Sequence, residues 1–334
     1  MKKLDAILNR TIDRRRLIGT VGATLGASAL LSACGVAAQP TPDGDDDVDA
    51  AILTFALNLE YLEAAFYLAA VGRLDELTAL GGSAPVILPD GVAGTNPSAG
   101  FSAEVRAFAN QLADHELAHV VFLRAALGDV LGAPVADRPT LDFSGSFAAA
   151  AEAAGVLAAG QGAAFNPFAN ELFFLHGTFV FEDVGVSAYN GAAPFVTNGP
   201  IVLQNAAGIL AAEAYHAGAV RLRLYQERNV VAIPGSISGT GVDMQVEEVV
   251  QRISDLRGAV GGGKDAGITF TSGPAMGELV LAPLDANAVA FARTPREVAN
   301  ITFLSSGMAS GGFFPDGFSV PGSLSGDIGF LLSL

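Results

Sequence analysis

The sequence predicts an all-α protein, a four-helix bundle followed by a C-terminal extension of helices and loops. Two observations support this fold class. The motif Glu-x-x-His occurs twice in apolar surroundings, and two other apolar segments each carry a glutamate followed seven residues later by a tyrosine. A helix advances about 100° per residue, so positions three or seven apart lie on one face. Each segment therefore presents its polar groups to one side.

The chain also repeats internally. The segments around Glu60 and Glu182 align so that Tyr67 falls on Tyr189. The two Glu-x-x-His segments align with each other in the same way, motif on motif. We therefore expect two helical hairpins related by a pseudo-twofold axis.

The first hairpin is predicted from its ends. Its first helix should run from about Val48 to Gly72, after an acidic cluster at residues 45–47 that suits a helix N-terminus. Ser102 is a good N-cap for the second helix, which should end near Gly128.

The second hairpin should follow a long connection. The third helix is expected from around Asn166 to Asn190, and the fourth from around Pro200 to before Asn229. With up-down-down-up pairs the second and third helices are parallel, so a long crossover must join them. A short Ala-rich segment starting at Ser146 should lie within it. The bundle is then predicted to occupy residues 48–229.

The extension, residues 230–334, differs in character. One amphipathic helix is expected at Val242–Leu256, and another follows a capping box from Thr294 to Glu297 and stops at Gly307. The remainder is rich in Gly, Pro and Ser, which suggests loops and a small hairpin packed on the bundle.

The N-terminus is predicted to be an export signal, residues 1–33. Basic residues precede an apolar stretch that is too short for a comfortable membrane span. Arg14–Arg16 resemble a twin-arginine signal; an ordinary secretory signal with a surplus arginine is the alternative. The only cysteine, Cys34, lies in a sequence that resembles a bacterial lipobox, so it is expected to be lipidated. Residues 34–47 would then be a lipid-anchored flexible tether.

Charge excludes one class of partner. Residues 1–33 carry six basic and two acidic side chains, so their removal changes the formal net charge from −16 to −20. Such a surface repels nucleic acid. Lys264 is the only lysine after the signal, so a lipid anchor is the one membrane attachment we expect.

The repeated motifs predict a dinuclear metal site. One glutamate from each of two helices, with Glu-x-x-His from each of the other two, is the ligand set of a carboxylate-bridged dinuclear centre. Two divalent ions bring four positive charges, which balance four buried carboxylates that would otherwise repel one another. The alternative is that these residues form ordinary helix surface, which fits poorly with their apolar neighbours. The predicted metal ligands are Glu60, Glu116, His119, Glu182, Glu213 and His216.

Three further residues are candidates beside the ligands. Tyr67 and Tyr189 could hydrogen-bond the ligand carboxylates or be core aromatics. Glu63 lies one turn from Glu60 and could serve as a ligand or gate the site, although it aligns with Gly185.

The remaining polar residues are expected to be structural. His115 and His176 lie off the ligand faces. Arg124 and Arg221 match in the two halves, and each is expected to be a helix-dipole or surface feature. Asp114 and Asp183 could orient a histidine, but their spacing does not place them.

Several segments carry a family resemblance. They are Asn58–Ala64, Phe168–Glu171, Phe181–Gly185, Ala212–Arg221, Asp285–Ala288, Arg293–Pro295 and Gly312–Pro315. In these runs the chain resembles the ferritin-like superfamily, and specifically the ferritin-like domain family that includes desiccation-related proteins. The resemblance spans nearly all of the chain after the signal.

The resemblance implies a ferritin-like bundle with a dinuclear iron or manganese centre on the six ligands. Such centres oxidise ferrous iron, dismutate peroxide or activate oxygen. We therefore expect an exported redox protein of the bacterial cell envelope, on its periplasmic side, that protects against oxidative or desiccation stress. The alternative is a structural envelope protein whose metal only stabilises the bundle. A monomer or small homo-oligomer suits the anchor and extension better than a storage cage.

Overall fold

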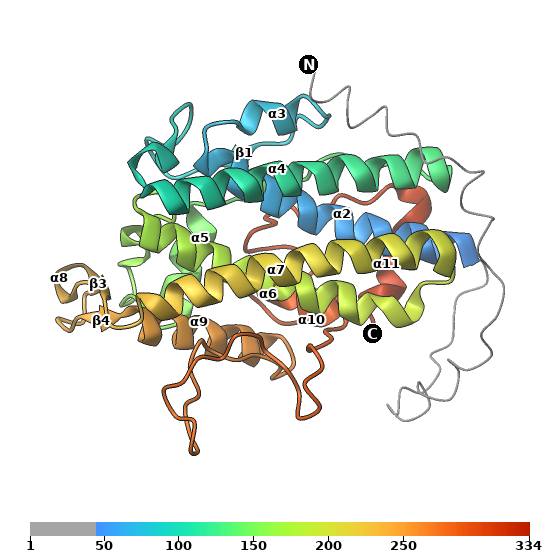
Figure 1. Ribbon diagram of the computed structural model, residues 1–334. Helices are drawn as coiled ribbons and strands as arrows, with labels where there is room; N and C mark the ends of the chain where they lie inside the picture. Colours follow the sequence, from blue (N-terminus) through green and yellow to red (C-terminus); the bar gives the residue numbers. More distant parts are fainter. Residues whose placement is uncertain (1–44) are drawn as a thin grey trace. The chain divides into compact units, whose positions relative to one another are not determined.

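The structure, a computed structural model, describes residues 45–334 (Figure 1). The predicted export signal, the lipidation site Cys34 and most of the predicted tether lie outside these residues. Those predictions remain untested by the fold.

Four long helices form the predicted bundle. α2 packs against α4, and α6 packs against α7, while α2 also contacts α6 across the two pairs. In Figure 1, α4 and α6 run in the same direction and α2 and α7 in the opposite one, as the up-down-down-up prediction requires. The all-α fold class is confirmed. The bundle helices are α2 (Asp45–Ala70), α4 (Ala103–Ala125), α6 (Glu171–Ala192) and α7 (Gln204–Gln226).

Side-chain caps set two of the helix starts. Ser102 Oγ accepts from the Val105 amide, so the predicted N-cap of α4 is confirmed. α6 begins later than expected, because the Asn166 side chain forms a local turn with the Phe168 amide. Asn170 then caps the helix by accepting from the Phe173 amide at 2.9 Å. α2, by contrast, starts earlier than predicted and includes the acidic cluster.

The connection between α4 and α6 contains the predicted Ala-rich helix, α5 (Gly145–Ala153). Near it, strand β1 (Val86–Ile87) pairs in parallel with β2 (Leu141–Asp142). These short elements tie the α2–α4 loop to the crossover. The remaining short elements are α3 (Leu74–Thr78) and single 3-10 or π turns at Pro97–Gly100, Ala126–Val130, Gly162–Ala164, Ala193–Phe195, Gly199–Leu203 and Gly322–Leu324.

The extension forms a small hairpin and short helices. β3 (Val231–Ile233) pairs antiparallel with β4 (Met244–Gln245). This pairing uses residues that we expected in a helix, so α9 begins four residues late. The capping box of α10 is confirmed, but the helix ends before Gly307, because Leu304 has a positive φ of 52°. The helices are α8 (Gly235–Ser238), α9 (Val246–Val260), α10 (Pro295–Thr302) and α11 (Ser325–Leu331).

The bundle core is aromatic at the α2–α6 contact. Phe66 on α2 is fully buried, and its ring centroid lies 5.3–5.7 Å from those of five other phenylalanines. They are Phe143, Phe147, Phe168, Phe174 and Phe181. A Cβ on Gly177 would stand 2.7 Å from the Phe66 ring, so only glycine permits this approach. α2 is long and apolar enough to span a membrane, but its apolar window is wholly buried in the protein, as in a core helix.

A buried network of arginines and aspartates fixes the extension to the bundle. Asp183 Oδ2 pairs with Arg221 at 2.8 Å and with Arg257 at 2.9 Å, while Asp265 pairs with Arg257 and Arg293. The surface prediction for Arg221 is therefore wrong: this side chain is fully buried and also donates to three backbone carbonyls of the extension. The prediction used only the position of Arg221 near the end of its helix, which does not show that the C-terminal extension covers this side chain.

Arg124, its match in the first half, is half-buried rather than a surface feature. Its guanidinium donates to the Tyr61 hydroxyl at 2.5 Å. The two arginines therefore share a position in the repeat but not a role.

Candidate metal centre

The structure brings all six predicted ligands together inside the bundle. They form two overlapping groups in which the donor atoms lie within 4.8 Å of one another. Glu116 belongs to both groups, so it would help to hold an ion in either of them. The first group is Glu60, Glu116, His119 and Glu213, and the second is Glu116, Glu182 and His216.

Each bundle helix supplies its share of this cluster. α2 and α6 each contribute one glutamate, while α4 and α7 each contribute the Glu and His of one motif. All four glutamates have no exposed surface. The surface interpretation of these residues is thus excluded by their burial.

The two histidines face the carboxylates through the same ring atom. His119 Nδ1 lies 3.0 Å from Glu116 Oε2 and 3.1 Å from Glu60 Oε2. His216 Nδ1 lies 3.1 Å from Glu116 Oε1 and 3.2 Å from Glu182 Oε2. Glu116 thus meets one imidazole with each of its oxygens, whereas its repeat counterpart Glu213 lies near His119 only, at 3.5 Å.

Many of these close atoms make no hydrogen bond. Five buried atoms have no hydrogen-bond partner among residues 45–334: His216 Nδ1, Glu116 Oε1, Glu182 Oε2 and both carboxylate oxygens of Glu213. Buried polar atoms without partners are costly, and here they converge instead of pairing. Carboxylate oxygens and imidazole nitrogens that share one enclosed volume are suitable ligands for divalent transition-metal ions. The residues at this site therefore fit the predicted dinuclear metal centre.

Burial and the neighbouring charges shift the pKa values of the clustered glutamates and histidines. Burial raises the pKa of Glu60 to about 7, and burial with the neighbouring carboxylates raises the pKa of Glu213 well above its usual range. Burial acts against the charged form of His119, but Glu60 and Glu116 outweigh it and raise the pKa of His119 to about 11. Without bound cations, protons on these groups offset part of the negative charge, and metal binding would release them.

Both predicted tyrosines hydrogen-bond the cluster, each across to the other half of the repeat. Tyr189 on α6 donates to Glu60 Oε1 on α2 at 2.5 Å, and Tyr67 on α2 donates to Glu182 Oε1 on α6. All four residues are buried. The hydroxyls fix the orientation of the two terminal carboxylates, which is the first of the two alternatives drawn from the sequence.

Glu63 lies at the edge of the cluster. It belongs to neither ligand group, its side chain is buried, and burial raises its pKa well above the usual range. It lines a cavity of about 10 Å³ together with Gly185, at the seam of α2 and α6. A Cβ on Gly185 would stand 2.4 Å from Glu213 Oε2, so this glycine makes room for a predicted ligand.

Of the other polar candidates, three do not contact the predicted ligands and one does. His176 is buried away from the cluster and contacts the Leu172 carbonyl at 2.6 Å, and burial lowers its pKa to about 4. Asp114 bonds Arg73 at the surface, and Asp183 bonds arginines, so neither orients a histidine. His115 was expected to be structural, but its Nδ1 lies 2.9 Å from Nε2 of a predicted ligand, His216. No helical spacing could reveal that contact, because it joins two helices.

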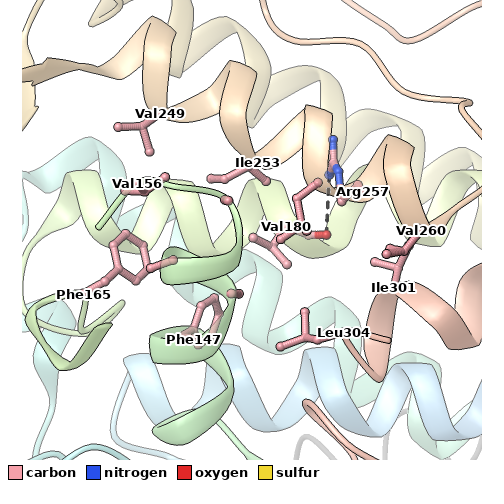
Figure 2. Close-up of a pocket in the computed structure, with 14 residues that line it drawn as sticks. Phe147, Val156, Phe165, Val180, Val249, Ile253, Arg257, Val260, Ile301 and Leu304 are labelled. Carbon is pink, nitrogen blue, oxygen red and sulfur yellow. Dashed lines mark hydrogen bonds between the residues drawn. The ribbon is translucent and has the colours of Figure 1, made fainter. Parts of the chain in front are cut away.

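A separate apolar pocket of about 40 Å³ lies where α5, α9 and α10 meet (Figure 2). Phe147, Val249 and Ile301 are among its lining residues, and Arg257 reaches its edge. None of the predicted metal ligands lines it, so it is distinct from the carboxylate cluster.

Comparison with known proteins identifies a matching family and two similar proteins. The ferritin-like domain family matches residues 48–226. Desiccation-related protein PCC13-62 of Craterostigma plantagineum is 34% identical over 281 residues, which cover 80% of this chain and 82% of that protein. Ferritin-like catalase Nec2 of Nesocodon mauritianus is 28% identical over 290 residues, covering 82% and 85%. No solved structure matches at the same level of significance.

Proposed function

This chain belongs to the ferritin-like domain family, and from that premise we propose that it binds two divalent ions, iron or manganese, and dismutates hydrogen peroxide. Two molecules of peroxide would yield two of water and one of dioxygen. The similarity to a protein named a ferritin-like catalase supports this reaction over ferrous-iron oxidation.

One observation carries the proposal: four buried carboxylates and two imidazoles converge with several donor atoms unpaired. Glu60, Glu116 and His119 with Glu213 would hold one ion, and Glu116, Glu182 and His216 the other. Two redox-active ions held side by side can exchange two electrons with peroxide.

The chain's own residues prepare the site for this chemistry. Tyr67 and Tyr189 fix the carboxylates of Glu182 and Glu60 by hydrogen bonds. Apolar side chains of α2 and α6 surround the cluster and limit the entry of water, which strengthens the electrostatic interactions inside. The cavity beside Glu63 is wide enough for one molecule the size of water.

The test is oxygen evolution from hydrogen peroxide by the protein purified from metal-replete cells. Activity should follow metal content across preparations and should be lost in Glu116→Ala, because Glu116 belongs to both ligand groups. Exposed Glu104→Ala, on the same helix, is the matched control and should retain activity.

A non-catalytic role is the second candidate, favoured by the 34% identity to a protein named for desiccation. In this case the metal would stabilise the bundle of an envelope protein that protects the cell during drying. Stoichiometric metal without oxygen evolution or ferrous-iron oxidation would support it.

We also propose that the protein is exported to the cell envelope and anchored through Cys34. The support is the sequence alone, the basic and apolar residues that end in a lipobox-like run. Fractionation of cells should place the protein with membranes, and Cys34→Ala should release it into the soluble envelope fraction.

A further inference from the structure

Within residues 45–334, one predicted ligand histidine, His216, has a partner outside the cluster that the other, His119, lacks. His115 Nδ1 lies 2.9 Å from His216 Nε2, and the two rings lie edge to edge, with centroids 5.2 Å apart and planes 13° apart. The other ring nitrogen of His216, Nδ1, faces Glu116 and Glu182. His216 is therefore held from outside the cluster by His115 while it points inward.

The pseudo-twofold axis shows that this contact is not general to the fold. The residue directly before the glutamate of the Glu-x-x-His motif is His115 in the first half and Ala212 in the second. Alanine offers no polar side chain. Accordingly, the hydrogen bonds found within residues 45–334 include none from Nε2 of His119.

From this asymmetry we propose that His115 is a positioning residue that makes the two metal positions unequal. The inference rests on the proposed function, since it needs ions at the cluster. A ring nitrogen that binds a metal must present its lone pair, so in the loaded protein Nε2 of His216 carries the proton.

His216 Nε2 then donates to His115 Nδ1, and this hydrogen bond fixes both the tautomer and the ring orientation. Partners of this kind typically change metal affinity about 10- to 100-fold. His115 thus strengthens binding at the position formed by Glu116, Glu182 and His216. The position that contains His119 gains nothing from it.

The experiment is a titration of metal-free protein with Co²⁺, followed by calorimetry and by visible absorption. The unchanged protein should bind two ions. In His115→Ala, one binding constant should fall about 10- to 100-fold, and the other should stay within about threefold. His115→Asn should recover most of the loss, because its side-chain oxygen can accept the same hydrogen bond.

Asp114→Ala is the matched control. Asp114 is an exposed neighbour on the same helix that bonds Arg73, so its loss changes local charge without touching His216. Both constants should be nearly unchanged in this variant.

The outcomes separate the two proposals. Two ions bound with unchanged constants in His115→Ala, or an equal fall of both constants, would overturn the role of His115 and leave the dinuclear centre standing. No Co²⁺ bound by the folded, unchanged protein would overturn the proposed function itself.

Discussion

Tyr189 donates a hydrogen bond of 2.5 Å to Glu60 Oε1, from the third bundle helix to the first. Its counterpart, Tyr67 to Glu182, runs the opposite way between the same helices. Because each half of the repeat fixes a carboxylate of the other half, the two hairpins must be docked correctly before either carboxylate is held. The same contacts therefore serve packing and metal binding.

Tyr189→Phe removes one of these hydrogen bonds and nothing else. Metal affinity should fall about 10- to 100-fold, because the Glu60 carboxylate loses the donor that orients it. Calorimetric titration with Mn²⁺ measures this loss. Exposed Tyr215→Phe, on α7, is the control and should bind as before. Unchanged affinity in Tyr189→Phe would mean that the hydroxyl does not orient the ligand.

Gly185→Ala should separate metal binding from stability. The added methyl would stand 2.4 Å from Glu213 Oε2, and this flexible side chain must turn away from the cluster. Alanine also favours the helix by about 1 kcal/mol over glycine. The metal-free variant should therefore unfold no earlier than the parent, while its bound metal falls in elemental analysis.

Gly218→Ala on α7 is the matched control for that variant. A Cβ there meets nothing within 4 Å, so it adds helix propensity without a contact. Metal content should be normal in Gly218→Ala. Full metal content in Gly185→Ala would contradict the position assigned to Glu213.

Asp183→Asn should destabilise the protein strongly. Arg221 and Arg257 are both buried and both pair with Asp183, so its neutralisation leaves two buried cations short of charge. Removing one partner of a buried pair typically costs about 3–5 kcal/mol. Urea unfolding measures this change. The exposed pair of Glu248 with Arg252 is the comparison, and Glu248→Gln should cost only about 0.3–0.5 kcal/mol.

His176 should make stability depend on pH. Burial lowers its pKa to about 4, against a value of about 6.5 in an unfolded chain. The unfolded state therefore binds a proton first, so stability is fully present above about pH 6.5 and falls as the pH approaches 4. The loss should reach roughly 3 kcal/mol.

His176→Leu tests this dependence in the metal-free protein, where ligand protonation is common to both chains. The difference in unfolding free energy between parent and variant should change across the range from pH 7.5 to 4.5. A difference that stays constant with pH would contradict the neutral, buried state of His176.

The sequence predicted the bundle and the ligand cluster because both follow from periodicity. The Glu-x-x-His spacing fixes which side chains share a face, and the internal repeat selects Glu60 over Glu63. Matching contexts in the two halves also assigned Tyr67 and Tyr189 to the same neighbourhood. These relations hold within one helix or between symmetric positions.

Contacts between distant segments could not be predicted in this way. Arg221 is buried because the extension places three backbone carbonyls against its guanidinium, and no spacing encodes that docking. His115 meets His216 across two helices. The late starts of α6 and α9 reflect a local turn and a short hairpin that compete for the same residues.

The most direct test of the central claim is the metal content of the folded protein from cells supplied with iron and manganese. We expect two ions per chain in the parent. Glu116→Ala should retain neither, because that carboxylate belongs to both ligand groups. A folded parent protein that carries no metal, and takes up none on titration, would contradict the account.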